Sequence, residues 1–419
     1  MSGEHESQAG VLFVCLYVEV FPDMNNSTPG MRPVAAAERV HILDILRGFA
    51  IFGILAVNII GFASPSFYPG YVWTGTSHWY DTIVDELILY FADGKFYTIF
   101  SFLFGLGFAL QLSRAESKGR DVLSFYPRRL WALFIIGCFH AVLLWTFDIL
   151  RLYALLGFVL LLFRKRSNRT LLLWTGVFLA AGSLLPSLVD NLDLSLEKMS
   201  GVDLVDEARL VFMNGSFIEV AVFQAFAGSI LFLSLDLLQG GTVMALFLLG
   251  LLVGRMKFFE RLSERRSTLW KLLIWGALVG LAGNLFFAVG TENEWLDSFS
   301  FTVGEIGVVS AYIGGLSLLH LTQGWDRILA PLGSVGRMAL TNYILQSLVC
   351  SLIFNGYGLG LYERLGSAWL LGITCAVYLA QIFFSNWWLS KFQFGPLEWL
   401  WRSLTYRKRQ PFRVADRTG

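Results

Sequence analysis

Ten long apolar stretches constrain this chain more than any other feature of its sequence. A helix needs about 20 apolar residues to cross the hydrocarbon core of a bilayer, and these stretches approach or reach that length. A spanning segment must satisfy its backbone hydrogen bonds internally, which favours helices throughout. The stretches lie near residues 43–63, 95–113, 128–147, 149–164, 170–189, 240–256, 269–289, 300–320, 337–356 and 367–390. The sequence therefore predicts an all-α, polytopic membrane helix bundle of about ten transmembrane helices.

The distribution of basic residues predicts the orientation of this bundle. Charged residues make up only 15% of the chain, so their positions are informative. If the N-terminus is cytoplasmic, all but five of the 32 Lys and Arg residues fall in cytoplasmic segments. The exceptions are Lys95, Arg151, Lys198, Arg209 and Arg364. Because cytoplasmic loops carry an excess of Lys and Arg, we expect both termini to be cytoplasmic.

The same rule assigns an ambiguous segment. Residues 217–238 are apolar but contain Glu219, Gln224 and Asp236. If this segment crossed the membrane, the basic cluster at 255–271 would lie outside. We therefore expect a re-entrant or interfacial helix on the outer side, next to the long outer loops.

The domain organisation is simple. Residues 39–406 should form a single transmembrane domain, in which 64–94 is the longest outer loop, and residues 407–419 a basic cytoplasmic tail. Residues 1–38 carry a short apolar run without the basic region of a signal peptide. We expect them to be a disordered or mis-annotated N-terminal extension, with Met24 and Met31 as alternative starts.

The first apolar helix carries a polar stripe. Asp44 and Arg47 lie three residues apart at its start and so share a face. Asn58 follows Arg47 by about three turns and returns to nearly the same azimuth. Polar groups in a membrane helix are costly and tend to line a site or a cavity. This stripe is therefore the first candidate for function.

A set of distinctive motifs runs through roughly residues 39–406. They are Leu43-Asp44-Ile45-Leu46-Arg47-Gly48 with Asn58, Gly94-Lys95-Phe96, Arg128-Arg129-Leu130, His140, Trp145 with Asp148-Ile149-Leu150, Gly336 to Tyr343 with Gln346, and Phe394-Gly395-Pro396-Leu397-Glu398-Trp399-Leu400-Trp401. Together these motifs resemble those of the YeiB-like family of bacterial membrane proteins, a domain of unknown function. The resemblance implies a multi-pass protein of the bacterial cytoplasmic (inner) membrane.

The opening motif is also similar to that of transmembrane acyltransferases, such as the lysosomal heparan glucosaminide acetyltransferase and the O-antigen acetylases. This similarity implies transfer of an acyl group from cytoplasmic acyl-CoA, acetyl-CoA above all, to an extracytoplasmic glycan, lipid or small acceptor. A transporter or flippase for a small molecule or lipid is the alternative. Against a carrier, the two halves of the chain show no inverted repeat.

An inner polar cluster is the candidate site for the acyl donor. Asp44, Arg47, Arg337 and Asn342 lie near the cytoplasmic ends of their helices. Forked guanidinium donors suit the phosphates of acyl-CoA. A structural ion pair between Asp44 and Arg47 would look the same in the sequence. Arg128 and Arg129 read as topological arginines that reach lipid headgroups.

An outer polar cluster is the candidate catalytic site. Asn58, Lys95, His140 and Asp148 lie toward the outer ends of their helices. Acyl transfer needs a base and donors to a developing oxyanion, and histidine fits the first role. Asp148 can orient His140, although His140 could equally make an interhelical hydrogen bond. His78 in the first outer loop is the rival base, because the heparan acetyltransferase-like enzymes place a histidine after the corresponding Asn.

The remaining polar groups bear on substrates and partners. Lys95, Glu305 at the start of the eighth helix, and Gln346 are candidate substrate contacts. In the transporter alternative Lys95, His140, Asp148 and Glu305 would form a proton or substrate path. The four Cys have unrelated spacing, and no pattern predicts a metal site or nucleic-acid binding. Membrane lipid is an expected partner, and the sequence leaves a homo-oligomer open.

Overall fold

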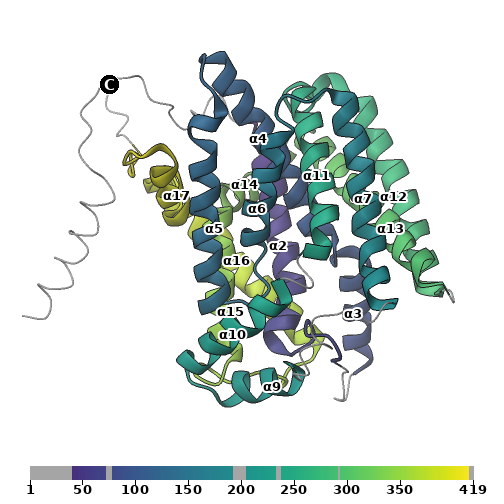
Figure 1. Cartoon of the computed structure of the whole chain (residues 1–419), viewed down its shortest axis with the longest axis vertical. Coiled ribbons are helices and arrows are strands. Elements are labelled where there is room, and N and C mark those ends of the chain that lie inside the picture. Colours follow the sequence, from purple (N-terminus) through teal and green to yellow (C-terminus); the bar gives the residue numbers. More distant parts are fainter. Residues whose placement is uncertain (1–39, 72–77, 192–203, 233–236, 291–292, 415–419) are drawn as a thin grey trace, which may run out of the picture.

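The computed structural model describes residues 40–71, 78–191, 204–232, 237–290 and 293–414 (Figure 1). These ranges are all α-helical apart from turns and short 3-10 segments, and they contain no β-strand. The predicted N-terminal extension lies outside the described residues. The helices are α2 (His41–Ala63), α3 (Trp79–Phe91), α4 (Lys95–Ser117), α5 (Tyr126–Leu143), α6 (Ile149–Leu162), α7 (Asn168–Asn191), α9 (Leu204–Asn214), α10 (Phe217–Leu231), α11 (Leu237–Arg255), α12 (Arg266–Val289), α13 (Glu294–His320), α14 (Trp325–Arg337), α15 (Ala339–Phe354), α16 (Ser367–Lys391) and α17 (Pro396–Tyr406).

Each predicted span coincides with one helix, but not all of them meet a strict test for crossing a membrane. The matching helices are α2, α4, α5, α6, α7, α11, α12, α13, α15 and α16. By length and hydropathy, 5 helical segments of the described chain could cross, or 6 if α14 and α15 are one broken span bent by 76°. The all-α multi-pass architecture is therefore confirmed, whereas the number of ten crossings stays a prediction.

The sequence prediction omits four helices and misplaces two residues along theirs. Helices α3 and α9 lie within segments expected to be outer loops, α14 precedes the expected ninth span, and α17 follows the expected tenth. Glu305 does not begin its helix, because α13 starts at Glu294. Asn58 does not end the first helix, because α2 continues to Ala63. Helix boundaries are hard to predict because the apolar periodicity of a helix can continue past a polar residue that seems to begin or end the helix.

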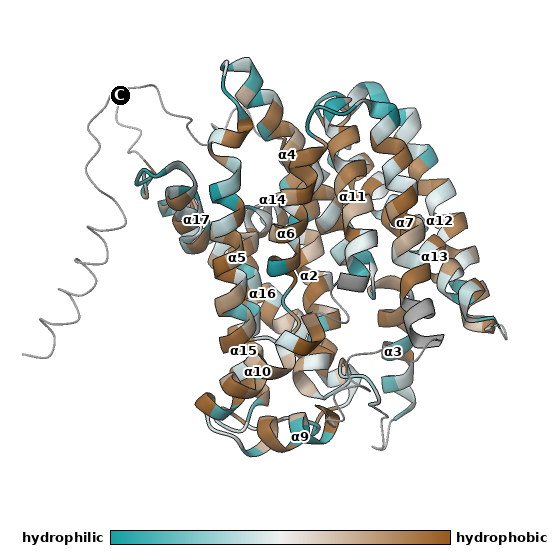
Figure 2. Ribbon diagram, viewed as in Figure 1, coloured by the Kyte–Doolittle hydropathy of each residue, from teal (hydrophilic) through white to brown (hydrophobic). Residues whose placement is uncertain are grey.

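The two ends of the bundle differ in character. Helices α3, α9 and α10 lie toward one end, whereas the turns around residues 114–126, 163–168 and 256–266 lie at the other (Figure 1). Hydrophilic residues gather at those turns, and apolar residues fill the middle of the bundle (Figure 2). Helix α10 matches the segment predicted as re-entrant or interfacial, and a capping box of Ser216 and Glu219 starts it.

The outward faces of several helices are apolar. On α5, Trp131, Ile135 and Phe139 follow one another at one-turn spacing and are 55%, 52% and 63% exposed. Large exposed apolar surfaces of this kind are unusual for a soluble protein and normal for a surface that contacts lipid. Polar residues such as Lys95, His140 and Asp148 are buried inside instead. The bundle therefore places its rare polar groups where they contact one another rather than lipid.

Helix α2 runs through the centre and contacts α4, α14, α15 and α16. Its closest approach is to α14, at Gly48 and Gly336. A Cβ atom added to Gly48 would overlap the carbonyl oxygen of Leu332, and one added to Gly336 would overlap that of Asp44. Small residues let membrane helices approach backbone to backbone. Two sequence motifs that are far apart in the chain therefore form one contact.

Glu398 joins two further motifs at the break between α14 and α15. Its carboxylate accepts hydrogen bonds from the backbone N–H groups of Leu340 (2.7 Å) and Thr341 (3.0 Å), and from the Thr341 hydroxyl (2.6 Å). These backbone donors belong to the first turn of α15, which lacks helical partners there. Burial raises the pKa of the Glu398 carboxyl, and the hydrogen bonds from Thr341 lower it. Helix α17 thus caps α15 and fixes the bend before it.

Candidate functional site

Three buried side chains from three helices form a linear hydrogen-bonded relay. His140, in the last turn of α5, places Nδ1 2.7 Å from Oδ1 of Asp148 and Nε2 2.8 Å from Oγ of Ser347 on α15. All three residues are at most 2% exposed. The structure therefore brings together the two predicted residues His140 and Asp148, and it adds Ser347, which the sequence analysis did not single out.

Asp148 is held in its position by the backbone as well. It is the N-cap of α6, where Oδ2 accepts the backbone N–H of Arg151 at 2.9 Å. The Arg151 guanidinium lies 3.7 Å from the same oxygen. Aspartate is a favoured N-cap residue, and its negative charge suits the positive end of the helix dipole. Both carboxylate oxygens of Asp148 therefore have hydrogen-bond partners inside the bundle.

One aromatic ring packs directly against the relay, and a second aromatic pair lies nearby in the sequence. The Tyr343 ring, one turn before Ser347 on α15, lies with its centroid 4.9 Å from that of His140. Trp145, two residues after the end of α5, is buried and stacks on Phe62 of α2 at 3.7 Å between centroids. Such an environment excludes water and strengthens electrostatic interactions inside it.

Lys95 and Glu305 form a separate group between α4 and α13. The fully buried Lys95 donates to the carbonyl oxygen of Leu89 at 2.8 Å, and its ammonium lies 4.7 Å from the centroid of the Phe301 ring. Glu305 accepts a hydrogen bond from Thr98. In the described chain no hydrogen bond or ion pair joins Lys95 or Glu305 to His140, so the predicted outer cluster divides into two.

Lys95 also shares in capping a helix end. The carbonyl groups of Leu89, Tyr90 and Phe91 end α3, and each accepts a hydrogen bond from a side chain of another helix. The donors are Lys95 (2.8 Å), Asn284 (3.1 Å) and Tyr312 (2.8 Å). These contacts satisfy carbonyl groups that a helix leaves without partners at its C-terminus. A structural role therefore accounts for the Lys95 ammonium without a substrate.

The other two predicted catalytic residues take different positions. Asn58 is half-buried on α2, and its side-chain amide makes no hydrogen bond within the described chain. His78 is exposed at the N-cap of α3, where its ring stacks on Tyr80 at 5.0 Å between centroids. No described contact brings His78 to the relay.

The inner cluster is an ion pair beside a second arginine. Arg47 donates to Asp44 at 2.8 Å, one turn apart on α2. The guanidinium of Arg47 faces Gly107 of α4, and its charge also acts on Arg129 of α5. Arg129 stacks on the Trp401 ring at 3.6 Å from its centroid. Asp44 thus balances the charge of Arg47, and Arg129 adds a second guanidinium that interacts electrostatically with Arg47.

The remaining predicted donor-binding and substrate residues join helices instead. Asn342 donates to the Val335 carbonyl (3.1 Å) and to Ser385 (2.9 Å). Gln346 donates to Gln381 (2.8 Å) and to the Ile51 carbonyl (3.3 Å). Interhelical bonds of this kind stabilise membrane bundles. Arg337 donates to the carbonyl of Gln393 at 3.5 Å.

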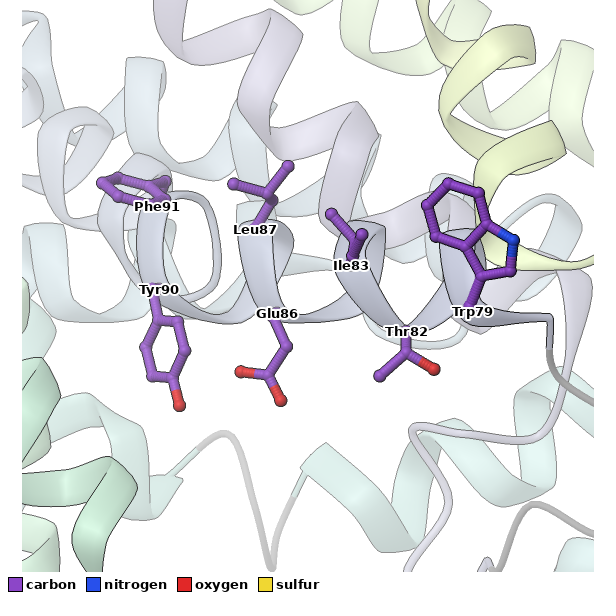
Figure 3. Close-up of a pocket in the computed structure, with 7 residues that line it drawn as sticks. All are labelled: Trp79, Thr82, Ile83, Glu86, Leu87, Tyr90 and Phe91. Carbon is purple, nitrogen blue, oxygen red and sulfur yellow. The ribbon is translucent and has the colours of Figure 1, made fainter.

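A groove of about 510 Å³ runs along α3. Its apolar wall is formed by Trp79, Ile83, Leu87 and Phe91, and Thr82, Glu86 and Tyr90 complete the lining (Figure 3). None of the predicted site residues lines it. The described residues also contain no group of three or more His, Cys, Asp or Glu side chains that could hold a metal ion.

Comparisons with known proteins place the sequence of this chain in a family. A family model described as "Protein of unknown function (DUF418)" matches residues 253–408. The chain is similar to the uncharacterized protein YxaH of Bacillus subtilis, with 34% identity over 407 residues that cover 93% of this chain and 99% of YxaH. It is similar also to the uncharacterized protein YeiB of Escherichia coli, with 30% identity over 391 residues that cover 89% of this chain and 98% of YeiB.

Proposed function

The chain belongs to the DUF418, YeiB-like family, as its match to the family model and its similarity to YxaH and YeiB show, and from that premise we propose that it is a transmembrane acyltransferase. It transfers an acyl group from cytoplasmic acyl-CoA, acetyl-CoA above all, to a glycan, lipid or small acceptor outside. In this proposal the chain crosses the bacterial inner membrane ten times, with both termini in the cytoplasm.

The Asp148–His140 pair is the observation that carries this proposal. A carboxylate bound to Nδ1 fixes the tautomer of an imidazole and raises its basicity, which leaves Nε2 as the proton acceptor. Here that pair lies inside a membrane bundle, where an ionisable residue suggests function by default. Transfer of an acyl group to a hydroxyl or amine requires a base of this kind.

The Arg47–Arg129 neighbourhood supports a donor site at the opposite end of the same helices. On α2, Arg47 precedes Asn58, and on α5, Arg129 precedes His140. Each helix therefore has an arginine toward its start and a polar residue of the predicted catalytic site toward its end. The phosphates of acyl-CoA would balance the two guanidinium charges, and a pantetheine arm would extend along the helices toward His140. The same two helices would then hold both the anion and the base.

Ligand-dependent stabilisation tests the donor site. Acetyl-CoA should raise the melting temperature of detergent-purified protein, because a ligand that binds only the folded state stabilises it by about 2.7 kcal/mol at 100 times its Kd. Arg47→Gln should remove this shift. Arg261→Gln, at an exposed arginine before α12, is the matched control and should keep it. A wild-type protein that responds to neither acetyl-CoA, longer acyl-CoA nor free CoA would contradict the proposal.

The buried group of Lys95 and Glu305 favours one second candidate, a transporter or flippase. Asp93 and Glu305 both act electrostatically on the Lys95 ammonium, and intramembrane groups of this kind form proton or ion paths in carriers. The two candidates differ in what Glu305→Gln would do. It should abolish coupled uptake in proteoliposomes if the protein is a carrier, and it should leave acyl transfer largely intact if it is an enzyme.

A further inference from the structure

Ser347 occupies a chemically distinctive place in the relay. Its hydroxyl lies 2.8 Å from Nε2 of His140, on the side of the ring opposite to Asp148. A second serine on α15, Ser351, is equally buried but donates to the backbone carbonyl of Leu144 at 3.0 Å. Of these two serines, only Ser347 contacts a base.

Charge balance indicates which nitrogen of the His140 imidazole carries the proton. Asp148 accepts from His140 and from the backbone of Arg151, and the Arg151 guanidinium supplies the compensating positive charge. A neutral imidazole leaves this group without net charge, which a membrane interior favours. The ring proton then lies on Nδ1, toward Asp148, and Nε2 is an acceptor. The Ser347 hydroxyl therefore donates to Nε2.

A doubly protonated His140 imidazole would leave the hydrogen bonds of Ser347 less well satisfied. An imidazolium would add a positive charge and donate from Nε2 to Ser347. The serine proton would then turn to the Tyr343 carbonyl, which is 3.4 Å away and so a poor acceptor. The geometry therefore favours a serine hydroxyl bound to a base that a carboxylate orients, which is the arrangement of an activated nucleophile.

We propose that Ser347 carries the acyl group as a covalent ester, so that transfer has two steps; this inference rests on the proposed acyltransferase function. In the first step Ser347 Oγ attacks the thioester carbonyl of acyl-CoA while Nε2 of His140 takes the hydroxyl proton. The carbon–sulfur bond breaks, the imidazolium of His140 returns that proton to the departing sulfur, and CoA leaves as its thiol. In the second step the acceptor oxygen attacks the ester, His140 takes the acceptor proton, and Ser347 leaves with it.

One structural feature and the two-step scheme itself both suit such an intermediate. The relay residues are at most 2% exposed, so an ester on Ser347 would be shielded from hydrolysis. A covalent carrier also divides the passage of the acyl group into two parts, one from the inner donor to Ser347 and one from Ser347 to the outer acceptor. Neither CoA nor the acceptor then has to cross the bundle.

Labelling without acceptor tests the intermediate. Purified full-length protein is incubated with radiolabelled acetyl-CoA, and its peptides are analysed by mass spectrometry. We expect one acetyl group on the α15 peptide, attached to Ser347, in stoichiometric amounts and removable by hydroxylamine. Ser347→Ala should lose this label and slow CoA release in native membranes by several orders of magnitude, because the attacking nucleophile is gone. Ser351→Ala is the matched control and should keep both.

The outcomes separate the two proposals. Ser347→Cys controls for folding, because it keeps the size of the side chain and should form a more labile thioester. If Ser347→Ala still transfers while His140→Ala does not, transfer is direct and the serine intermediate is refuted, although the enzyme remains. If the wild-type protein neither acquires the label nor releases CoA with any acyl-CoA, the acyltransferase function itself fails.

Discussion

At the scale of single residues, Asp148 combines two tasks. It begins α6 as an N-cap, and it binds the imidazole of His140. Replacing an N-cap by alanine costs about 1 kcal/mol, and leaving a buried partner unsatisfied costs about 1–3 kcal/mol more. Asp148 therefore links the fold to the proposed chemistry, and a loss of activity at this position alone would not separate them.

His140 separates stability from chemistry better than Asp148 does. His140→Ala should abolish acyl transfer while acetyl-CoA still raises the melting temperature, because the donor phosphates bind near Arg47 and only the proton-transfer step is lost. His78→Ala, at the exposed N-cap of α3, should change the rate by less than about tenfold. Transfer measured in native membranes compares the two. Loss of activity in His78→Ala with retention in His140→Ala would make the loop histidine the base.

At the scale of elements, the contact between α2 and α14 depends on glycine. Gly336→Ala should destabilise the protein by several kcal/mol, because the added methyl group meets the backbone carbonyl of Asp44, which cannot move without moving α2. Gly333→Ala on the same helix is a matched control. Its Cβ would lie 3.6 Å from Ile45, an ordinary contact, and alanine has the higher helix propensity. Melting in detergent should show a large loss for Gly336→Ala and none for Gly333→Ala.

The same scale shows what a sequence can and cannot predict. Each predicted span coincides with a helix because apolar composition determines where a membrane helix lies. His140 and Asp148 meet because only a short turn separates them. Ser347 lies 207 residues from His140, and no periodicity in either helix indicates that their faces meet. Lys95 and His140 were expected together from depth alone, but depth does not determine azimuth. Nothing in the sequence indicates that Glu398 caps α15, because a cap supplied by another helix depends on the tertiary fold.

At the scale of the whole molecule, topology is the prediction with the clearest measurement. Asn293 precedes α13 and Ser263 precedes α12, and both are exposed. In a variant without native cysteines, Asn293→Cys should react with an impermeant maleimide on intact cells. Ser263→Cys should react only after permeabilisation, because it lies in the basic segment expected inside. Reversal at either position would contradict the proposed orientation.

Residues that lie far apart in the sequence can make contact only after both have been synthesised. Helix α2 leaves the ribosome first, yet Gly48 accepts a hydrogen bond from Tyr378, 330 residues later. At about 5–20 residues per second, Ser347 follows His140 by roughly 10–40 s. During that interval the nascent chain holds a histidine and an aspartate in the bilayer with their third partner still untranslated. The relay can therefore exist only in a chain that has been synthesised at least as far as α15.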